Sequence, residues 1–335
     1  MTDNTGRVID YLRISVTDKC NLRCRYCMPP EGVTSLRHED ILSFEEITRV
    51  CKIMARLGIK KVRITGGEPL VRKDICRLIE GLHAIPGIEE IAMTTNATLL
   101  APLAGELKRA GLDRVNISLD ALDPLVFAAI TGRDALGEVK EGLLAALSVG
   151  FGVKINCVPC KELNEGELRR VAAIAQNQPV DVRFIELMPI GCGKQFHGIS
   201  SGELLKDFSA FFGEPREAPA SPGGGPACYY HFPGFQGRIG FISPISHKFC
   251  KSCNRVRLTA EGRFKLCLHY ESGIDLRKYL RDGQTGDGQL EAMILEAVKQ
   301  KPAAHHFESL GEKETSERAS EKEVTEERNM NQIGG

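Results

Sequence analysis

The feature that most constrains the fold is a regular series of strand-like and helix-like segments in the first 190 residues. Helical patterns fall at 44–57, at 102–111 and at 138–149, and a Ser43–Glu46 capping box precedes the first of them. Six such units in series predict a parallel sheet with helices on its outside, which right-handed crossovers curl toward a barrel. The expected strands are 11–16, 61–65, 90–94, 114–119, 152–158 and 181–187.

Several of these strands alternate apolar and polar residues, although strands covered on both faces are usually continuously apolar. Val62 and Ile64 would share one face, and Arg63 and Thr65 the other. A complete eight-stranded barrel fills its interior with branched apolar side chains. We therefore expect a wider, incomplete barrel with a charged ligand inside, and the alternative is a few satisfied polar groups at strand ends. The same alternation recurs at Leu12 and Ile14, at Val115 and Ile117, and at Val153 and Ile155.

The regular alternation of strand-like and helix-like segments ends at about residue 195. A helix is expected at 200–212, a loop at 214–227, which is rich in Pro, Gly and Ala, and strands of a smaller region at 235–242 and 256–268. The expected fold class is α/β, an incomplete (βα)6 TIM-like barrel with a C-terminal extension. The predicted domains are 1–195, the partial barrel, and 196–335, the C-terminal region.

Charge and hydropathy exclude several classes of partner. The chain of 335 residues carries 44 basic and 44 acidic residues, which gives no overall field for nucleic acid or an anionic membrane. No stretch approaches the ~20 apolar residues of a membrane span, and residues 1–7 lack the apolar core of a secretory signal. A cytoplasmic location is expected. Disulfides are rare there, so the 12 cysteines are read as metal ligands or buried thiols.

Cys20, Cys24 and Cys27 form a C-x3-C-x2-C group directly after the first expected strand. Three thiolates on one loop can hold three irons of a [4Fe–4S] cluster and leave the fourth open to a small molecule. A structural zinc site normally has four protein ligands, and ordinary Fe–S carriers use four cysteines. The spacing therefore favours an open-site cluster over zinc, an electron carrier or coincidence.

A second group, Cys250, Cys253 and Cys267, again offers three thiolates, in a C-x2-C-x13-C pattern. His247 and His269 lie nearby in the sequence, so a mixed zinc site is an alternative to a second cluster with an open iron. Arg255 and Arg257 follow at once and would face the same way on an extended segment. Paired guanidinium groups beside a cluster suit a phosphorylated substrate.

The first cysteine group resembles the signature of the radical S-adenosylmethionine superfamily, and Gly66-Gly67-Glu68-Pro69 after the second strand resembles its GGE segment. The resemblance implies that S-adenosylmethionine chelates the open iron and yields a 5'-deoxyadenosyl radical, while the protein orients and shields it. The residues expected to contact this cofactor are Tyr26, Gly67, Ser118 and Met188.

Both cysteine groups together, with Cys-Asn-Arg-x-Arg after the second, resemble the GTP 3',8-cyclase family of molybdenum cofactor biosynthesis, from Tyr11 to about Tyr279 and at the last residues. The resemblance implies two [4Fe–4S] clusters and cyclisation of GTP to 3',8-cyclo-7,8-dihydro-GTP. It also implies catalytic roles for Arg257 and a terminal Gly334-Gly335 pair. Ala97 departs from the family, which usually has Gly there. The implied GTP contacts are Arg13, Arg63, Thr94, Lys154, Arg255 and Arg257.

The same resemblance implies an electron donor such as flavodoxin or ferredoxin, a downstream cyclic pyranopterin monophosphate synthase, and a homodimer. Two other functions stay open at this point. One is a radical enzyme that modifies peptides with an auxiliary cluster, and the other is a non-catalytic Fe–S sensor. Formation of 5'-deoxyadenosine would separate the sensor from any radical enzyme.

Overall fold

The computed structural model describes residues 1–219, 225–307 and 325–334. Its strands form one mixed sheet, in which β1 to β6 run parallel and lie side by side in sequence order. The six strands expected from the sequence are thus confirmed, with ends that differ by no more than two residues. They are β1 Tyr11–Ser15, β2 Lys61–Thr65, β3 Glu90–Thr95, β4 Arg114–Ser118, β5 Gly152–Cys157 and β6 Asp181–Ile185.

The C-terminal strands extend this sheet at both ends. On one side β9 (Arg238–Ile242) pairs parallel with β6, followed by β8 (Cys228–His231) and β7 (Arg216–Ala218). On the other side β10 (Arg255–Leu258) pairs parallel with β1, followed by β11 (Arg263–Lys265) and β12 (Gly273–Asp275).

Two predicted segments also need correction. The loop expected at 214–227 contains β7, because its backbone pairs with β8 at the edge of the sheet. The single strand expected at 256–268 is two antiparallel strands, β10 and β11, joined by a turn in which Gly262 has a φ of +90°. Such a backbone angle favours glycine and reverses the chain there.

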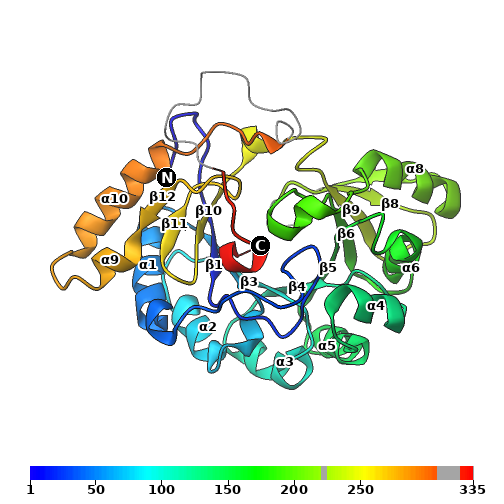
Figure 1. Cartoon of the computed structure of the whole chain (residues 1–335), viewed down its shortest axis with the longest axis horizontal. Helices are drawn as coiled ribbons and strands as arrows, with labels where there is room; N and C mark the ends of the chain where they lie inside the picture. The colour runs from blue at the N-terminus through cyan, green and yellow to red at the C-terminus, as the bar shows by residue number, and fades with distance from the viewer. Residues whose placement is uncertain (220–224, 308–324, 335) are drawn as a thin grey trace.

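The helices between the first strands lie around the outside of the curved sheet (Figure 1). The capping box predicted for α1 is present, since Ser43 Oγ accepts from the Glu46 amide and the Glu46 carboxylate accepts from the Ser43 amide. The helices are α1 Phe44–Arg56, α2 Ile75–His83, α3 Leu100–Arg109, α4 Pro124–Thr131, α5 Leu136–Ser148, α6 Leu168–Ala172, α7 Ile174–Asn177, α8 Ser201–Phe212, α9 Leu276–Leu280, α10 Asp287–Lys299 and α11 Met330–Ile333.

The two faces of the strands divide as their alternation predicts. The apolar positions, such as Val62 and Ile64, belong to the buried core that includes residues of the outer helices. The opposite face carries Arg13, Arg63 and Lys154. Among the described residues the sheet has two distinct edge strands, β12 and β7, and is therefore open. In the same part of the chain, no helix combines the length and apolarity needed to cross a lipid bilayer.

Ala97, the departure noted in the sequence, has a φ of +63° and is fully buried after β3. A left-handed conformation costs a residue with a Cβ roughly 1–2 kcal/mol, and glycine adopts it freely. We expect Ala97→Gly to raise the free energy of unfolding by about 1 kcal/mol. Denaturant unfolding of the variant measures this. Ala104→Gly within α3 is the control and should lower stability, and a destabilised Ala97→Gly would contradict the prediction.

Candidate active site

The first cysteine loop follows β1 and is held by backbone bonds. The amides of Cys27 and Met28 both donate to the Cys24 carbonyl, at 2.8 and 3.1 Å, and form a tight turn. The Leu22 amide lies 3.5 Å from Cys20 Sγ, and Asn96 Nδ2 lies 3.9 Å from the same sulfur. The turn thereby presents all three sulfurs from one short segment.

The three thiols lie close enough to perturb one another. Burial raises the pKa of Cys24 well above its usual value, and the neighbouring Cys27, Asp120 and Cys20 add to the effect. Burial also raises the pKa of Cys27 to about 12. Thiolates bind iron in Fe–S clusters, and metal binding must displace the thiol protons. Three cysteines on one short loop, near enough for their charges to interact, fit an open-site cluster.

Gly66 and Gly67 pack against the backbone of residues 17–19, just before this loop. A Cβ on Gly67 would stand 2.3 Å from the Lys19 carbonyl oxygen and 2.6 Å from that of Asp18. The Gly67 and Glu68 amides donate to the carbonyls of Thr17 and Lys19, at 2.7 and 2.8 Å. The absence of side chains thus lets the GGE segment approach the backbone that precedes Cys20.

Gly67→Ala should therefore displace the cysteine loop. We expect S-adenosylmethionine affinity to fall roughly tenfold or more, because a shift of about 1 Å in a positioned site costs up to about 10²-fold. Equilibrium binding to the reconstituted protein, together with iron content, measures this. Gly166→Ala is the matched control, since no atom lies within 4 Å of its Cβ position. Unchanged affinity in Gly67→Ala would contradict the assignment.

The other expected cofactor contacts lie on the same rim. The Tyr26 hydroxyl donates to Asp120 Oδ2 at 2.6 Å, and Asp120 Oδ1 accepts from the Val158 amide at 2.8 Å. Ser118 is the last residue of β4, and Met188 packs against the small apolar cluster of Ile190, Phe307 and Ile333. The hydroxyl of Tyr26 is thus engaged by Asp120.

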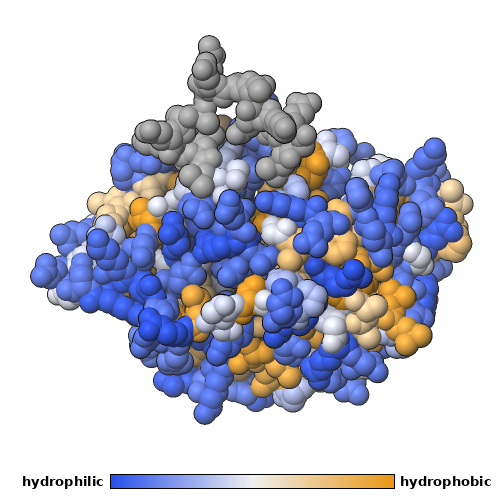
Figure 2. Space-filling view, viewed as in Figure 1, coloured by the Kyte–Doolittle hydropathy of each residue, from blue (hydrophilic) through white to orange (hydrophobic). Residues whose placement is uncertain are grey.

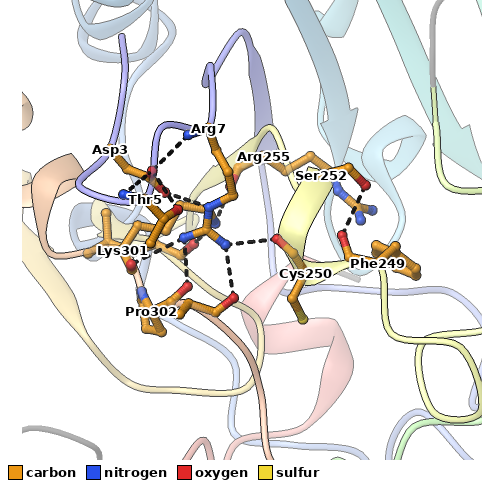
Figure 3. Close-up of polar contacts among 11 residues, drawn as sticks. Asp3, Thr5, Arg7, Phe249, Cys250, Ser252, Arg255, Lys301 and Pro302 are labelled. Atoms are coloured by element: carbon orange, nitrogen blue, oxygen red, sulfur yellow. Dashed lines mark hydrogen bonds and ion pairs between the residues drawn. The ribbon is translucent and has the colours of Figure 1, made fainter.

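The second cysteine loop precedes β10 and is tied to the N-terminal segment and to the segment after α10 (Figure 3). Arg7 donates to the Cys250 carbonyl at 2.9 Å and to the carbonyls of Lys301 and Pro302 at 3.2 and 2.7 Å. Its Nε is paired with Asp3 at 2.6 Å. Arg7 therefore joins the N-terminal segment, the cysteine loop and the segment after α10.

Positive charge surrounds these cysteines. Burial would raise the pKa of Cys253, but the charges of Lys301 and Arg255 outweigh it and lower that pKa to about 7. Lys301 Nζ donates to the carbonyls of Arg255 and Leu266, at 2.8 and 2.5 Å, next to two of the cysteines. Burial raises the pKa of Cys250, to which the nearby Cys267 and Cys253 add. Three sulfurs beside buried cations fit an anionic iron–sulfur cluster.

No three His, Cys, Asp or Glu side chains in the described parts of the chain converge closely enough to hold a single metal ion. The mixed zinc site with His247 or His269 gains no support from this. His269 instead packs its ring against Tyr270 and Phe307, with ring centroids 4.5 and 4.4 Å away.

A row of arginines crosses the polar face of the sheet. Strand register places Arg13 of β1 directly beside Arg257 of β10 and Arg63 of β2. Burial lowers the pKa of Arg257 to about 10, with a contribution from the charge of Arg255, so Arg257 stays protonated at neutral pH. Burial likewise lowers the pKa of Arg13 and Arg63. Repelling cations held side by side form a site for a polyanion.

Some buried polar atoms on this face have no hydrogen-bond partner among the described residues: Arg63 Nε, the Thr94 hydroxyl and the Tyr11 hydroxyl. Buried polar groups are nearly always hydrogen-bonded, so such atoms require an explanation. Two of these three residues are among the GTP contacts expected from the sequence. A polar ligand on this face would satisfy all three.

Lys154, another expected GTP contact, already has protein partners. Its Nζ lies 3.4 Å from Asp181 Oδ2 and 3.3 Å from the Tyr229 hydroxyl. Arg183, which the sequence interpretation missed, is buried beside it and donates to Asn116 Oδ1 at 2.7 Å and to Asn156 Oδ1 at 3.0 Å. Its place between Val182 and Phe184 repeats the alternation that identified the other strands and could have revealed it.

The C-terminal segment reaches the same face, where α11 lies over the strands (Figure 1). Arg257 Nη1 donates to the Gly334 carbonyl at 2.6 Å. Gly334 has a φ of +73°, and a Cβ there would stand 2.9 Å from the Ser15 Cβ. Gly335, the second predicted tail residue, lies outside the described residues. The structure therefore brings together Gly334 and Arg257, two of the residues to which the sequence resemblance assigns catalytic roles.

Glu68 is a further residue near the site. It belongs to the GGE segment, but the sequence analysis assigned it no role. Its buried carboxylate accepts from Thr95 Oγ1 and from the Asn96 amide, both at 2.7 Å. Burial raises the pKa of Glu68 to about 7. It thereby joins the GGE segment to the end of β3, next to the first cysteine loop.

Known proteins resemble this chain along most of its length. The Radical SAM superfamily matches residues 14–175, and Molybdenum Cofactor Synthesis C matches residues 180–307. A GTP 3',8-cyclase of Peptoclostridium acidaminophilum is 46% identical over 313 residues, which cover 92% of this chain and 94% of that protein. One from Clostridium botulinum (strain Langeland) is 44% identical over all of both chains. The chain belongs to the GTP 3',8-cyclase family.

Membership in the GTP 3',8-cyclase family makes the chain a radical S-adenosylmethionine enzyme of molybdenum cofactor biosynthesis. The Radical SAM match supports a [4Fe–4S] cluster and S-adenosylmethionine as cofactors. Among solved structures, Streptococcus suis SuiB bound to S-adenosylmethionine is similar with a TM-score of 0.59 and 15% identity. That match covers 85% of this chain and 68% of SuiB, and at this identity it shows the shared α/β fold alone.

Proposed function

We propose that the enzyme cyclises GTP to 3',8-cyclo-7,8-dihydro-GTP within an incomplete barrel formed by β1–β6, with residues 1–195 as the barrel domain and 196–335 as the C-terminal domain. The row of Arg257, Arg13 and Arg63 is the observation that carries the choice of a nucleotide triphosphate. A precursor peptide, the substrate of the rival maturase function, would not need three adjacent buried cations.

In this proposal Cys20, Cys24 and Cys27 hold the first [4Fe–4S] cluster, and Cys250, Cys253 and Cys267 hold a second one. When bound, the first cluster and S-adenosylmethionine would supply a 5'-deoxyadenosyl radical. Removal of the C3' hydrogen of GTP, which becomes part of 5'-deoxyadenosine, would let C3' bond to C8, and one electron and one proton would then complete the 7,8-dihydro product. The residues proposed to orient the cofactor are Tyr26, Gly67, Ser118 and Met188.

The protein's part is to bind and orient GTP. Arg13, Arg63, Arg255 and Arg257 would bind phosphate through charge-assisted hydrogen bonds, which are short and roughly twice as strong as neutral ones. Thr94 would donate or accept at the ribose side, and Lys154 would exchange its contact with Asp181 for one with the substrate. Fixing C3' near the radical source supplies much of the rate, because proximity replaces a bimolecular encounter.

Arg257 also bonds the Gly334 carbonyl, so we propose that the terminal glycines and Arg257 act together on the reacting nucleotide. A flavodoxin or ferredoxin would deliver electrons, a cyclic pyranopterin monophosphate synthase would take the product, and the chain would work as a homodimer in the cytoplasm. The same assignment needs neither nucleic acid nor membrane as partner.

The experiment is anaerobic. The protein is reconstituted with iron and sulfide, mixed with dithionite, S-adenosylmethionine and GTP, and analysed by mass spectrometry. GTP-dependent 5'-deoxyadenosine together with a cyclised nucleotide is the expected result. Formation of 5'-deoxyadenosine without consumption of GTP would overturn the substrate, and no 5'-deoxyadenosine with both clusters intact would overturn the radical chemistry and favour a sensor.

A further inference from the structure

The C-terminal segment 325–334 is attached to the sheet by a buried ion pair that the catalytic assignments do not use. Lys265 of β11 and Glu326 form a salt bridge in which both side chains are completely shielded from solvent. Lys265 lies directly opposite Arg257 in the β10–β11 ladder. The attachment point of the segment is therefore one strand away from the arginine that binds Gly334.

Glu326 makes hydrogen bonds through both its backbone amide and its carboxylate. Its amide donates to the His269 carbonyl at 2.7 Å, and its carboxylate accepts from Arg328 Nε at 2.9 Å. Arg328 in turn donates to Glu261 at 2.5 Å. Although burial alone would raise the pKa of Glu326, the bonds from Arg328 and Lys265 lower it to about 2. These bonds favour the ionised carboxylate. Burial lowers the pKa of Lys265, and the hydrogen bond and charge of Glu326 oppose that effect.

Beyond the ion pair, the segment touches the first cysteine loop and the loop that follows β6. Asn331 Nδ2 donates to the Asp18 carbonyl at 3.1 Å, and the Asn331 amide is bonded to the thiol of Cys27. Asn329 Oδ1 accepts from the Cys192 amide at 3.2 Å. Ile333 is buried against Ile190. These contacts are hydrogen bonds of neutral side chains and apolar packing. The Lys265–Glu326 pair instead joins two ionisable side chains that are shielded from solvent.

We propose that Lys265 and Glu326 are positioning residues, a buried anchor that holds the C-terminal segment so that Gly334 reaches Arg257 and Asn331 reaches the first cysteine loop. This inference rests on the proposed function, because it assigns the segment's placement to productive cyclisation. Removing one charge leaves the other buried without a partner, which is strongly unfavourable, so the segment is expected to detach.

The test compares Glu326→Gln with the wild-type holoenzyme by hydrogen exchange of the 326–334 peptide and by steady-state kinetics. We expect exchange to accelerate about tenfold or more, which corresponds to 1.4 kcal/mol of lost local stability. The kcat for the cyclised product should fall about tenfold, while KM for S-adenosylmethionine stays unchanged. A merely structural role would not produce this split between kcat and KM.

Glu89→Gln is the matched control, because it removes the carboxylate of an exposed pair with Lys60 at 2.8 Å and should leave both readouts unchanged. If Glu326→Gln does not fold, the double variant Lys265→Gln/Glu326→Gln decides, since it buries no unpaired charge. It too should show faster exchange of the segment and a lower kcat.

Wild-type exchange in whichever variant folds would overturn the anchor, and faster exchange with an unchanged kcat would overturn its role in positioning. If the wild-type enzyme itself formed no cyclised GTP, the proposed function would fail, whereas the exchange data would still decide whether the pair anchors the segment.

Discussion

Replacing Cys24 with Ala is expected to reduce 5'-deoxyadenosine formation to background. Cys24 is half-buried in the turn between Cys20 and Cys27, and its carbonyl organises that turn. Two thiolates cannot replace three in holding a cluster whose fourth iron must stay open. The measurement is 5'-deoxyadenosine released under reducing conditions, with iron content determined on the same sample.

Cys51→Ala is the matched control for this prediction, because Cys51 is a buried cysteine of α1 that belongs to the apolar core. We expect that variant to lose some stability but to keep its iron and its cofactor cleavage. If Cys24→Ala kept wild-type 5'-deoxyadenosine formation, the first cysteine group would not be the cluster site.

Replacing Arg257 with Ala is expected to weaken GTP binding about 10- to 100-fold, because a hydrogen bond to a charged group contributes about 1.5–3 kcal/mol. The variant also loses the bond to the Gly334 carbonyl. Cleavage of S-adenosylmethionine without cyclisation should persist, since Arg257 lies on β10 and the first cysteine loop follows β1. Equilibrium binding of GTP and the ratio of 5'-deoxyadenosine to cyclised product measure both effects.

For this second prediction Arg133→Ala serves as the control, because it removes an arginine whose side chain is 43% exposed and pairs with Glu138 on the surface. Its GTP affinity should equal that of the wild type. Intact GTP affinity in Arg257→Ala would remove Arg257 from the phosphate site.

Much of the barrel half was predictable because local patterns agree with the tertiary structure there. The alternation in 61–65 placed Arg63 on the polar face, and the Ser43–Glu46 capping box set the start of α1. Each signal lies within a few residues, so a single sequence is enough to recognise it. The side of the molecule drawn in Figure 2 is largely hydrophilic, with apolar patches at its lower centre and on its right.

The C-terminal half was less predictable because its structure depends on distant pairing. Nothing local in 255–258 indicates that β10 lies beside β1, with Arg257 next to Arg13. The Lys265–Glu326 pair joins residues 61 positions apart, and no motif marks either partner. Of the site, cysteine spacing and strand alternation indicated the ligands and arginines, whereas the contacts of the C-terminal segment required the structure.

The central claim is that the radical acts on C3' of GTP, and isotope transfer tests it most directly. The reconstituted enzyme is given GTP deuterated at C3', and the 5'-deoxyadenosine is analysed by mass spectrometry, with GTP deuterated at C2' in a parallel reaction. Deuterium in 5'-deoxyadenosine from the C3' label alone is the predicted result. Unlabelled 5'-deoxyadenosine from the C3' substrate, or label transferred from C2', would contradict the account.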